Sequence, residues 1–340
     1  MGIRMSEARD WSRPDRTVFP PVTILSLVGG TVVGSDALMS LLSGCFAPRL
    51  FLRIRGLGAA LCLALMASAA EPASPSTTAP SPKLPLVPLP ASTHSFQVVS
   101  HRGSHLKKAP ENSLQSIEAA IADGADFVEM DIRRTKEGVH FLMHDSKPRR
   151  MLPDAPDLPL SQLEWPAIKD LPLKAPAGSD LPKTTVPTFQ EALLACRGRI
   201  KIYLDFKDGD RPAVARMIAD AGMEKQVAVY DGAGAIPVWR SLTPRLPLIV
   251  TPPREATVSA EALKNWLTEH PVEVLDRIDA KYSPKLVEAA HALGVAVWPD
   301  TLGGKDRPDD WNRAAAAGVD GVQTDHPEAV AKWREERARR

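Results

Sequence analysis

The sequence predicts an α/β protein folded as a (β/α)8 TIM barrel, and two observations support this. Short runs rich in β-branched residues alternate with segments whose apolar residues recur every three or four positions, a pattern that predicts a parallel sheet. Eight such strands fit within the last 245 or so of the 340 residues, the usual size of a closed barrel. No GxGxxG loop follows the first strand, which disfavours an open dinucleotide-binding sheet.

The expected elements follow one another as a repeated βα unit. We expect strands at residues 97–100, 127–132, 200–206, 227–230, 248–251, 273–280, 295–298 and 321–324. We expect helices at residues 113–123, 189–196, 212–221, 260–270, 284–293 and 309–317. Four glycines, Gly124, Gly222, Gly294 and Gly318, each come just after a helical segment, where a left-handed residue ends a helix.

Residues 1–69 are predicted to be an export signal. A basic stretch at 49–55 precedes an apolar run at 57–66, and small residues at 67–69 follow as a cleavage site. The run is shorter than the ~20 residues that a membrane span needs, so we expect no permanent transmembrane helix. The protein is therefore expected to be secreted or periplasmic. The signal is long if translation starts at Met1, and Met39 is an alternative start.

The rest of the N-terminal region leaves one alternative open. Cys45 ends a Leu-Ser-Gly-Cys sequence that matches a bacterial lipobox, so a lipid anchor at Cys45 is the alternative to a cleaved signal. Residues 70–95 are rich in Pro and Ser and are predicted to be an extended linker before a barrel domain at 96–335. Cys196 is then alone in the mature chain and is expected to be a small buried side chain.

The overall charge points to a small-molecule partner. The chain has 42 basic and 41 acidic residues, a formal net charge of +1, which gives no basic surface for nucleic acid. The sequence does not indicate an oligomeric state.

Three carboxylates are expected to form a metal site at the C-terminal ends of the strands, where barrel active sites lie. Glu129 and Asp131 are two apart in a strand and so face the same side, and Asp205 ends the next parallel strand. Oxygen ligands of this kind suit a hard divalent cation, with Ca²⁺ expected first and Mg²⁺ as the alternative. The other interpretation is that these are solvated charges at an edge.

Two histidines are candidates for acid-base catalysis. His101 closes the first strand, and a hairpin that turns at residues 136–138 brings His144 back to within about one residue of Asp131. The loop length leaves the register, and so the face of His144, undetermined. Imidazole titrates near neutral pH, so the two rings can divide the acid and base roles.

Further polar residues are expected to surround the same mouth. Arg102 and Lys207 are candidates to bind phosphate oxygens, although either could simply pair with a carboxylate. Glu111 and Asn112 open the first helix, where Asn112 can serve as the N-cap. Trp298 ends a late strand, where it is expected either to stack on the substrate or to pack in the core.

These motifs resemble the glycerophosphodiester phosphodiesterase family across roughly residues 97–330. The resemblance rests on the order His101-Arg102-Gly103, Pro110-Glu111-Asn112-Ser113, Glu129-Met130-Asp131, Gly138, His144-Asp145 and Thr324-Asp325. It implies a barrel of the phosphatidylinositol-phospholipase type, a divalent ion at Glu129 and Asp131, and His101 and His144 as the acid-base pair. It also implies that a glycerol hydroxyl attacks phosphorus, an alcohol leaves, and water opens the cyclic phosphate to glycerol 3-phosphate.

The departures from the family pattern raise questions about the metal and the substrate. Asp205 stands where the family more often has Glu, and Pro299-Asp300 replaces the usual continuation after Trp298. The long segment 148–187 is expected to cover the mouth and shape the alcohol pocket. The alternatives to a glycerophosphodiesterase are a phosphodiesterase acting on intact phospholipids or lysophospholipids, and a noncatalytic barrel that binds phosphodiesters.

Overall fold

Parallel strands joined by helices form the centre of the described chain, which comprises residues 84–278 and 282–339 of a computed structural model. The parallel strands are β1 (Gln97–Ser100), β2 (Phe127–Arg134), β4 (Lys201–Phe206), β5 (Val227–Tyr230), β6 (Leu248–Val250), β7 (Val274–Leu275), β8 (Ala296–Val297) and β9 (Gly321–Thr324). Their spatial order is β8-β7-β6-β5-β4-β2-β1-β9. A parallel bridge between Asp300 and Gln323 joins the two ends, so the predicted eight-stranded parallel barrel is confirmed.

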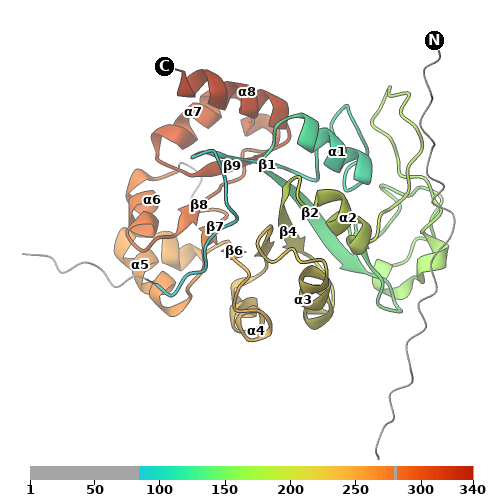
Figure 1. The fold of residues 1–340 in the computed structure, drawn as a ribbon, viewed down its shortest axis with the longest axis horizontal. Coiled ribbons are helices and arrows are strands. Elements are labelled where there is room, and N and C mark those ends of the chain that lie inside the picture. The colour runs from blue at the N-terminus through green and yellow to red at the C-terminus, as the bar shows by residue number, and fades with distance from the viewer. Residues whose placement is uncertain (1–83, 279–281, 340) are drawn as a thin grey trace, which may run out of the picture. The chain divides into compact units, whose positions relative to one another are not determined.

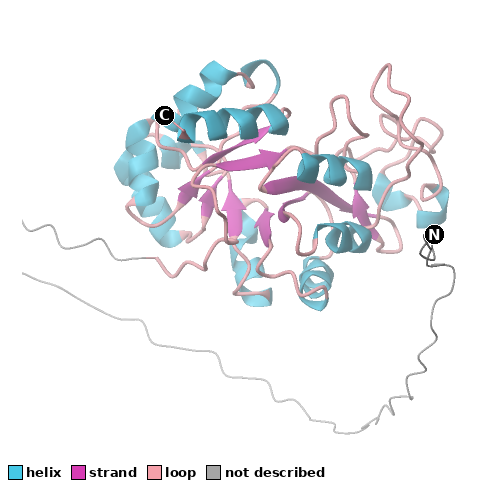
Figure 2. Cartoon of the chain, turned by 45° about the horizontal axis from the view of Figure 1, so that its top comes forward, coloured by secondary structure: helices cyan, strands magenta, loops and turns pink. Residues whose placement is uncertain are grey.

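Helices surround these strands (Figures 1 and 2). They are α1 (Leu114–Ala122), α2 (Phe189–Cys196), α3 (Arg211–Asp220), α4 (Ile236–Leu242), α5 (Ala260–Glu269), α6 (Pro284–His291), α7 (Pro308–Ala316) and α8 (Pro327–Ala338), with short 3-10 turns between some of them. The four predicted helix-ending glycines all have positive φ, between 66° and 88°. Among the described residues, no helix is both long enough and apolar enough to cross a membrane.

Two predicted strands are shorter in the structure. The strand expected at 273–280 is Val274–Leu275, and the one expected at 295–298 is Ala296–Val297. The Asp276 amide still donates to the Val250 carbonyl on β6 at 3.1 Å, and its carboxylate accepts hydrogen bonds from the Tyr203 and Thr251 hydroxyls, each at 3.0 Å. The polar segments that follow these short strands therefore belong to the mouth of the barrel.

An additional strand, β3 (His140–Leu142), runs antiparallel to the end of β2. Ile132 pairs with Leu142, and the Met143 amide donates to the Asp131 carbonyl at 3.0 Å. This register puts His144 one residue beyond the position opposite Asp131, as the sequence predicts.

The interior of the barrel is filled by side chains from alternating strand positions. Val99, Phe127, Tyr203, Ala228, Ile249, Val274 and Trp298 form this cluster, and the larger apolar core lies between the strands and the helices. Phe141, Met143 and buried residues between 151 and 186 form a separate core. The long segment after β3 is therefore packed on apolar side chains of its own.

The part of the predicted linker that the structure describes lies against the barrel. Residues 84–93 have no helix or strand, but Leu84, Leu86 and Leu89 pack on the cores. The Val87 amide donates to Glu273 at 3.0 Å, at the start of β7, and Figure 1 shows this cyan segment running across the strands. The predicted signal at 1–69, Cys45 and linker residues 70–83 lie outside the described residues.

Candidate active site

The predicted site residues collect at the C-terminal ends of the strands. β1 leads directly into His101 and Arg102, β2 carries Glu129 and Asp131, and β4 carries Asp205. β2 and β4 are paired so that Asp131 lies opposite Asp205. Adjacent parallel strands therefore bring His101 and Arg102 to the same end of the barrel as the three predicted metal ligands.

The three carboxylates predicted to hold a metal lie close enough to share one ion. Ligand oxygens of Glu129, Asp131 and Asp205 are all within 4.8 Å of one another. Burial and the charges of Asp131 and Asp205 raise the pKa of Glu129 well above its ordinary value. Burial and the charge of Asp131 raise the pKa of Asp205 to about 6. A cation between them would offset this repulsion, so the donor set fits a divalent metal.

Both predicted phosphate-binding cations contact this cluster. Lys207 Nζ lies 2.6 Å from Asp205 and 3.3 Å from Asp131, and Arg102 Nε lies 3.5 Å from Asp131. Burial lowers the pKa of Lys207, but the neighbouring carboxylates outweigh burial and leave that pKa raised. Lys207 and Arg102 are therefore held as charged groups beside the carboxylates.

A strained loop after β1 fixes two of these groups. Arg102 has φ of 51°, and its amide donates to Glu129 Oε2 at 2.7 Å. Asn112, with φ of 54°, donates from Nδ2 to Asp131 at 2.7 Å and accepts from the Asp131 amide at 3.0 Å. Left-handed residues of this kind cluster at functional sites. A Cβ on Gly103 would collide with Ser116, so the close approach of this loop to α1 requires glycine.

The prediction that Asn112 serves as the N-cap of the first helix is wrong. The N-cap of α1 is Ser113, whose hydroxyl accepts from the Ser116 amide in a capping box. Because both polar groups of the Asn112 side chain are used by Asp131, Asn112 positions a metal-ligand candidate instead.

His101 is oriented by the residue that follows the last strand. His101 Nδ1 lies 2.8 Å from Asp325 Oδ1, and because an ionised carboxylate only accepts, the proton sits on Nδ1 and leaves Nε2 free. Asp325 Oδ2 also accepts from the Gly303 amide at 3.3 Å. The ring of His105 packs edge-on against that of His101, with 5.9 Å between the ring centroids.

His144 is oriented in the same way, by the aspartate that follows it. Its Nδ1 lies 2.8 Å from Asp145 Oδ1. Arg150 binds both carboxylate oxygens of Asp145 and both of Glu111, and Glu111 also accepts from Arg102 at 3.1 Å. Burial raises the pKa of Asp145, but hydrogen bonds from Arg150 and His144 outweigh it and hold that pKa at about 2.

Trp298 packs in the barrel interior, one of the two roles predicted for it. It is 2% exposed, and its ring lies 4.9 Å from that of Phe127 between centroids. Its Nε1 has no hydrogen-bond partner among the described residues.

Sequence reasoning missed the roles of Asp325 and Arg150. The Thr324-Asp325 pair at the end of the last strand was a usable signal for Asp325, because β9 pairs with β1 in a closed barrel and so places Asp325 next to His101. Arg150 lies in a coil segment, where no periodic pattern predicts which way its side chain points.

The arrangement defines a (β/α)8 barrel enzyme whose acidic cluster and two histidine–aspartate pairs suit hydrolysis of a phosphate ester. Solved structures share the fold. The glycerophosphodiester phosphodiesterase of Agrobacterium tumefaciens has a TM-score of 0.60 and 23% identity, covering 71% of this chain and 99% of its own. An Oleispira antarctica phosphodiesterase has a TM-score of 0.57 and 20% identity, covering 70% and 96%.

Sequence comparison supplies the family. A profile of the Glycerophosphoryl diester phosphodiesterase family matches residues 101–224 and 237–329, so the chain belongs to that family. A glycerophosphodiester phosphodiesterase of Caldanaerobacter subterraneus subsp. tengcongensis is 26% identical over 243 residues, 68% of this chain and 95% of the relative. The mouse glycerophosphodiester phosphodiesterase 1 is 35% identical over 116 residues, 32% of this chain and 33% of the relative. The protein is accordingly a phosphoric diester hydrolase that acts on glycerophosphodiesters.

Proposed function

We propose that the enzyme releases glycerol 3-phosphate and an alcohol from soluble glycerophosphodiesters by acid-base catalysis with His101 and His144. The observation that carries this proposal is the pair of histidine–aspartate contacts, His101 with Asp325 and His144 with Asp145, each 2.8 Å long. Each histidine is next in sequence to a residue whose amide donates to a residue of the carboxylate cluster, His101 to Arg102 and His144 to Met143, and each pair leaves Nε2 of its ring available for proton transfer.

In this mechanism the two rings exchange protons with the substrate on either side of phosphorus. One ring starts as neutral imidazole and takes the proton from the 2-hydroxyl of the glycerol as that oxygen forms the new P–O bond. The other ring starts as imidazolium and gives its Nε2 proton to the departing alkoxide as the P–O bond to the alcohol breaks. The cyclic phosphate is then opened by water with the two roles exchanged, which returns both rings to their starting states. The carboxylates of Asp325 and Asp145 stabilise each imidazolium while it is charged.

A divalent cation held by Glu129, Asp131 and Asp205 would supply positive charge to the nonbridging phosphate oxygens. We expect Ca²⁺ first and Mg²⁺ as the alternative, because the ligands are all hard oxygens. Arg102 and Lys207 lie beside the same carboxylates. There they bind the phosphate and stabilise the negative charge that develops on it in the transition state.

Further support comes from a structural relative. The Oleispira antarctica phosphodiesterase was solved in complex with the product sn-glycerol-3-phosphate, and it shares the barrel with this chain.

We also propose that the β2–β3 hairpin is an insertion in the repeating βα plan, because it is the element that carries His144 to the mouth.

The test measures glycerol 3-phosphate released from glycerophosphocholine in the presence of Ca²⁺ or Mg²⁺. We expect turnover by the wild type and losses of about 100-fold or more in His101→Ala and His144→Ala, the range for a lost general acid or base. His291→Ala is the matched control, since His291 pairs with Asp320 at the far end of β9. Equal activity in all four proteins would refute the assigned roles.

A second assay separates soluble diesters from lipids. Lysophosphatidylcholine and glycerophosphocholine differ only by the acyl chain, and we expect turnover of the deacylated substrate to dominate. The reverse preference would favour the lipid phosphodiesterase alternative.

We also propose that the protein is exported. The support is the basic stretch, apolar run and small residues at 49–69, with lipidation of Cys45 as the alternative address. N-terminal sequencing of the mature protein distinguishes cleavage near Ala69 from processing at Cys45.

A further inference from the structure

A cavity opens at the barrel mouth, on the side formed by β6, β7 and β8. Its volume is about 710 Å³, and its lining includes Thr251, Arg254, Arg277, Tyr282, Asp300 and Lys305. Binding sites for whole small molecules are usually about 300–1,000 Å³. The three-carbon glycerol arm needs only a part of such a space.

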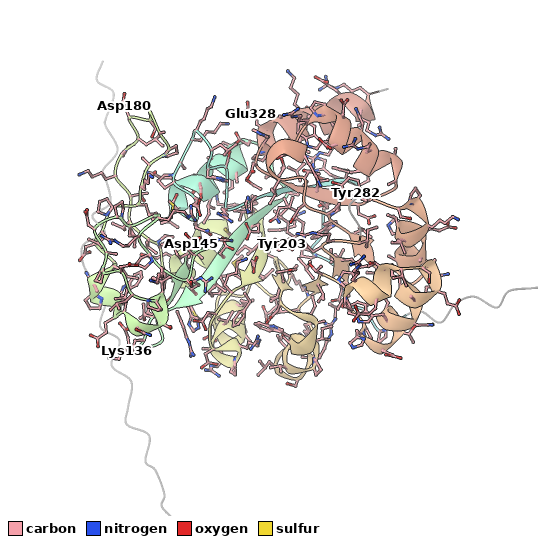
Figure 3. All side chains as sticks on the ribbon, turned by 180° about the vertical axis from the view of Figure 1, so that it is seen from behind. Lys136, Asp145, Asp180, Tyr203, Tyr282 and Glu328 are labelled. Atoms are coloured by element: carbon pink, nitrogen blue, oxygen red, sulfur yellow. The ribbon has the colours of Figure 1, made fainter. Side chains whose placement is uncertain are left out.

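Hydrogen bonds connect two walls of the cavity to residues of the candidate active site. The wall segment 299–305 contains Gly303, whose amide donates to the Asp325 carboxylate that orients His101. On the other side, Thr251 donates to Asp276, and Asp276 accepts from Tyr203 on β4, two residues before Asp205. In Figure 3, Tyr203 lies between Asp145 and Tyr282, which lines the cavity. The cavity walls are therefore linked by hydrogen bonds to the strand ends that carry His101 and Asp205, at the same mouth of the barrel.

The charges of this cavity favour an anion. Arg277 is bound to Asp300 at 2.6 Å, so these two lining charges offset each other. Arg254 and Lys305 are exposed, and among residues 84–278 and 282–339 neither side chain has a hydrogen-bonding or ion-pair partner. Two lining cations without a partner among the described residues attract negative charge and leave little reason for a choline-like cation to bind there.

We propose that this cavity binds the departing alcohol of a glycerophosphodiester when that alcohol carries its own phosphate group. The inference rests on the proposed function and narrows its substrate class. Arg254 and Lys305 would bind the additional phosphate by charge-assisted hydrogen bonds, and Thr257 and Tyr282 also line the cavity.

The experiment compares glycerophosphoinositol with glycerophosphoinositol 4-phosphate, two substrates that differ by one phosphate on the alcohol. We expect the wild type to show a kcat/KM about tenfold higher for the phosphorylated substrate, a preference that falls as salt rises because exposed charges are screened. In the double variant Arg254→Gln, Lys305→Gln the ratio should fall to about one. Arg216→Gln is the matched control, since it removes an exposed charge on α3, and it should leave the ratio unchanged.

Each outcome separates this inference from the proposed function. A ratio at or below one in the wild type, or a ratio that survives in the double variant, overturns the cavity assignment. Glycerophosphocholine is assayed in the same preparation. If it is hydrolysed without any preference between the inositol substrates, only the cavity assignment fails. If none of the three substrates is hydrolysed, the proposed function itself fails.

Discussion

Replacing Asp325 with Asn tests how His101 is oriented. Asp325 uses two acceptors, with Oδ1 2.8 Å from His101 Nδ1 and Oδ2 3.3 Å from the Gly303 amide. Asparagine has one acceptor and one donor. In one orientation the asparagine NH2 group faces the Gly303 N–H, so that two donors oppose each other. In the other orientation the NH2 group donates to His101 Nδ1, and the His101 proton moves to Nε2, which is the wrong tautomer for a base.

The expected loss follows from the hydrogen bond that disappears. A hydrogen bond to a charged group is worth about 1.5–3 kcal/mol, so Asp325→Asn should lower kcat about 10- to 150-fold. KM should change little, because Asp325 reaches the substrate only through His101. The assay is steady-state release of glycerol 3-phosphate from glycerophosphocholine, with thermal unfolding measured in parallel.

A matched control lies at the other end of the same strand. Asp320, just before β9, pairs with His291 at 2.8 Å, so Asp320→Asn makes the same change in an aspartate–histidine pair away from the mouth. We expect its kcat to stay within about twofold of wild type. If Asp325→Asn lowers only the melting temperature and leaves kcat unchanged, Asp325 merely anchors the loop and the reasoning is refuted.

Three further predictions concern other parts of the chain. Arg150→Gln should lower kcat about tenfold, because Arg150 no longer fixes the Asp145 carboxylate that orients His144. It should also raise the acid-unfolding midpoint in circular dichroism. Arg150 helps hold the pKa of Asp145 at about 2, below its ordinary 3.8, so the Asp145 contacts contribute stability that is fully present above pH 3.8 and is lost as pH falls towards 2. The variant lacks part of this contribution and should unfold at a higher pH; an unchanged midpoint would contradict this. Burial raises the pKa of the Cys196 thiol to about 12, so iodoacetamide near about pH 8 should alkylate Cys196 in the unfolded but not in the folded protein, as read by peptide mass spectrometry; rapid labelling of Cys196 in the folded protein would be the opposing result. Asp205→Asn should weaken divalent-cation binding more than about tenfold in isothermal titration calorimetry, since it removes a charged ligand, and unchanged affinity would exclude Asp205 as a ligand.

The repeating pattern of the chain was sufficient to predict the barrel. Strands β1, β5 and β9 begin and end at the predicted residues, because each is a short apolar run bounded by turn or cap residues. Of the strand expected at 273–280, Val274–Leu275 is a strand, residues 279 and 280 lie outside the described chain, and the polar side chains beside the strand have partners on other elements. Glu273 is buried in an ion pair with Arg240, and Asp276 bonds to Tyr203. Such long-range pairings leave no periodic signal.

The candidate site was predictable where its residues sit at strand ends. Glu129 and Asp131 share a face by the two-residue period of a strand, and the register of β2 and β4 then places Asp205 beside them. Arg150 was not predictable in this way, because its position depends on the tertiary packing of the segment after β3. Asn112 was assigned to a helix cap from its type and position, but Asp131 offered it a stronger pair of hydrogen bonds.

The most direct test of the central claim is the metal dependence of hydrolysis. Wild-type protein is treated with EDTA, desalted, and assayed for glycerol 3-phosphate release from glycerophosphocholine before and after addition of Ca²⁺ or Mg²⁺. If Glu129, Asp131 and Asp205 hold a catalytic divalent cation, chelation should reduce the rate by about 100-fold or more and one of the two ions should restore it. Full activity in the chelated, metal-free protein would contradict the account.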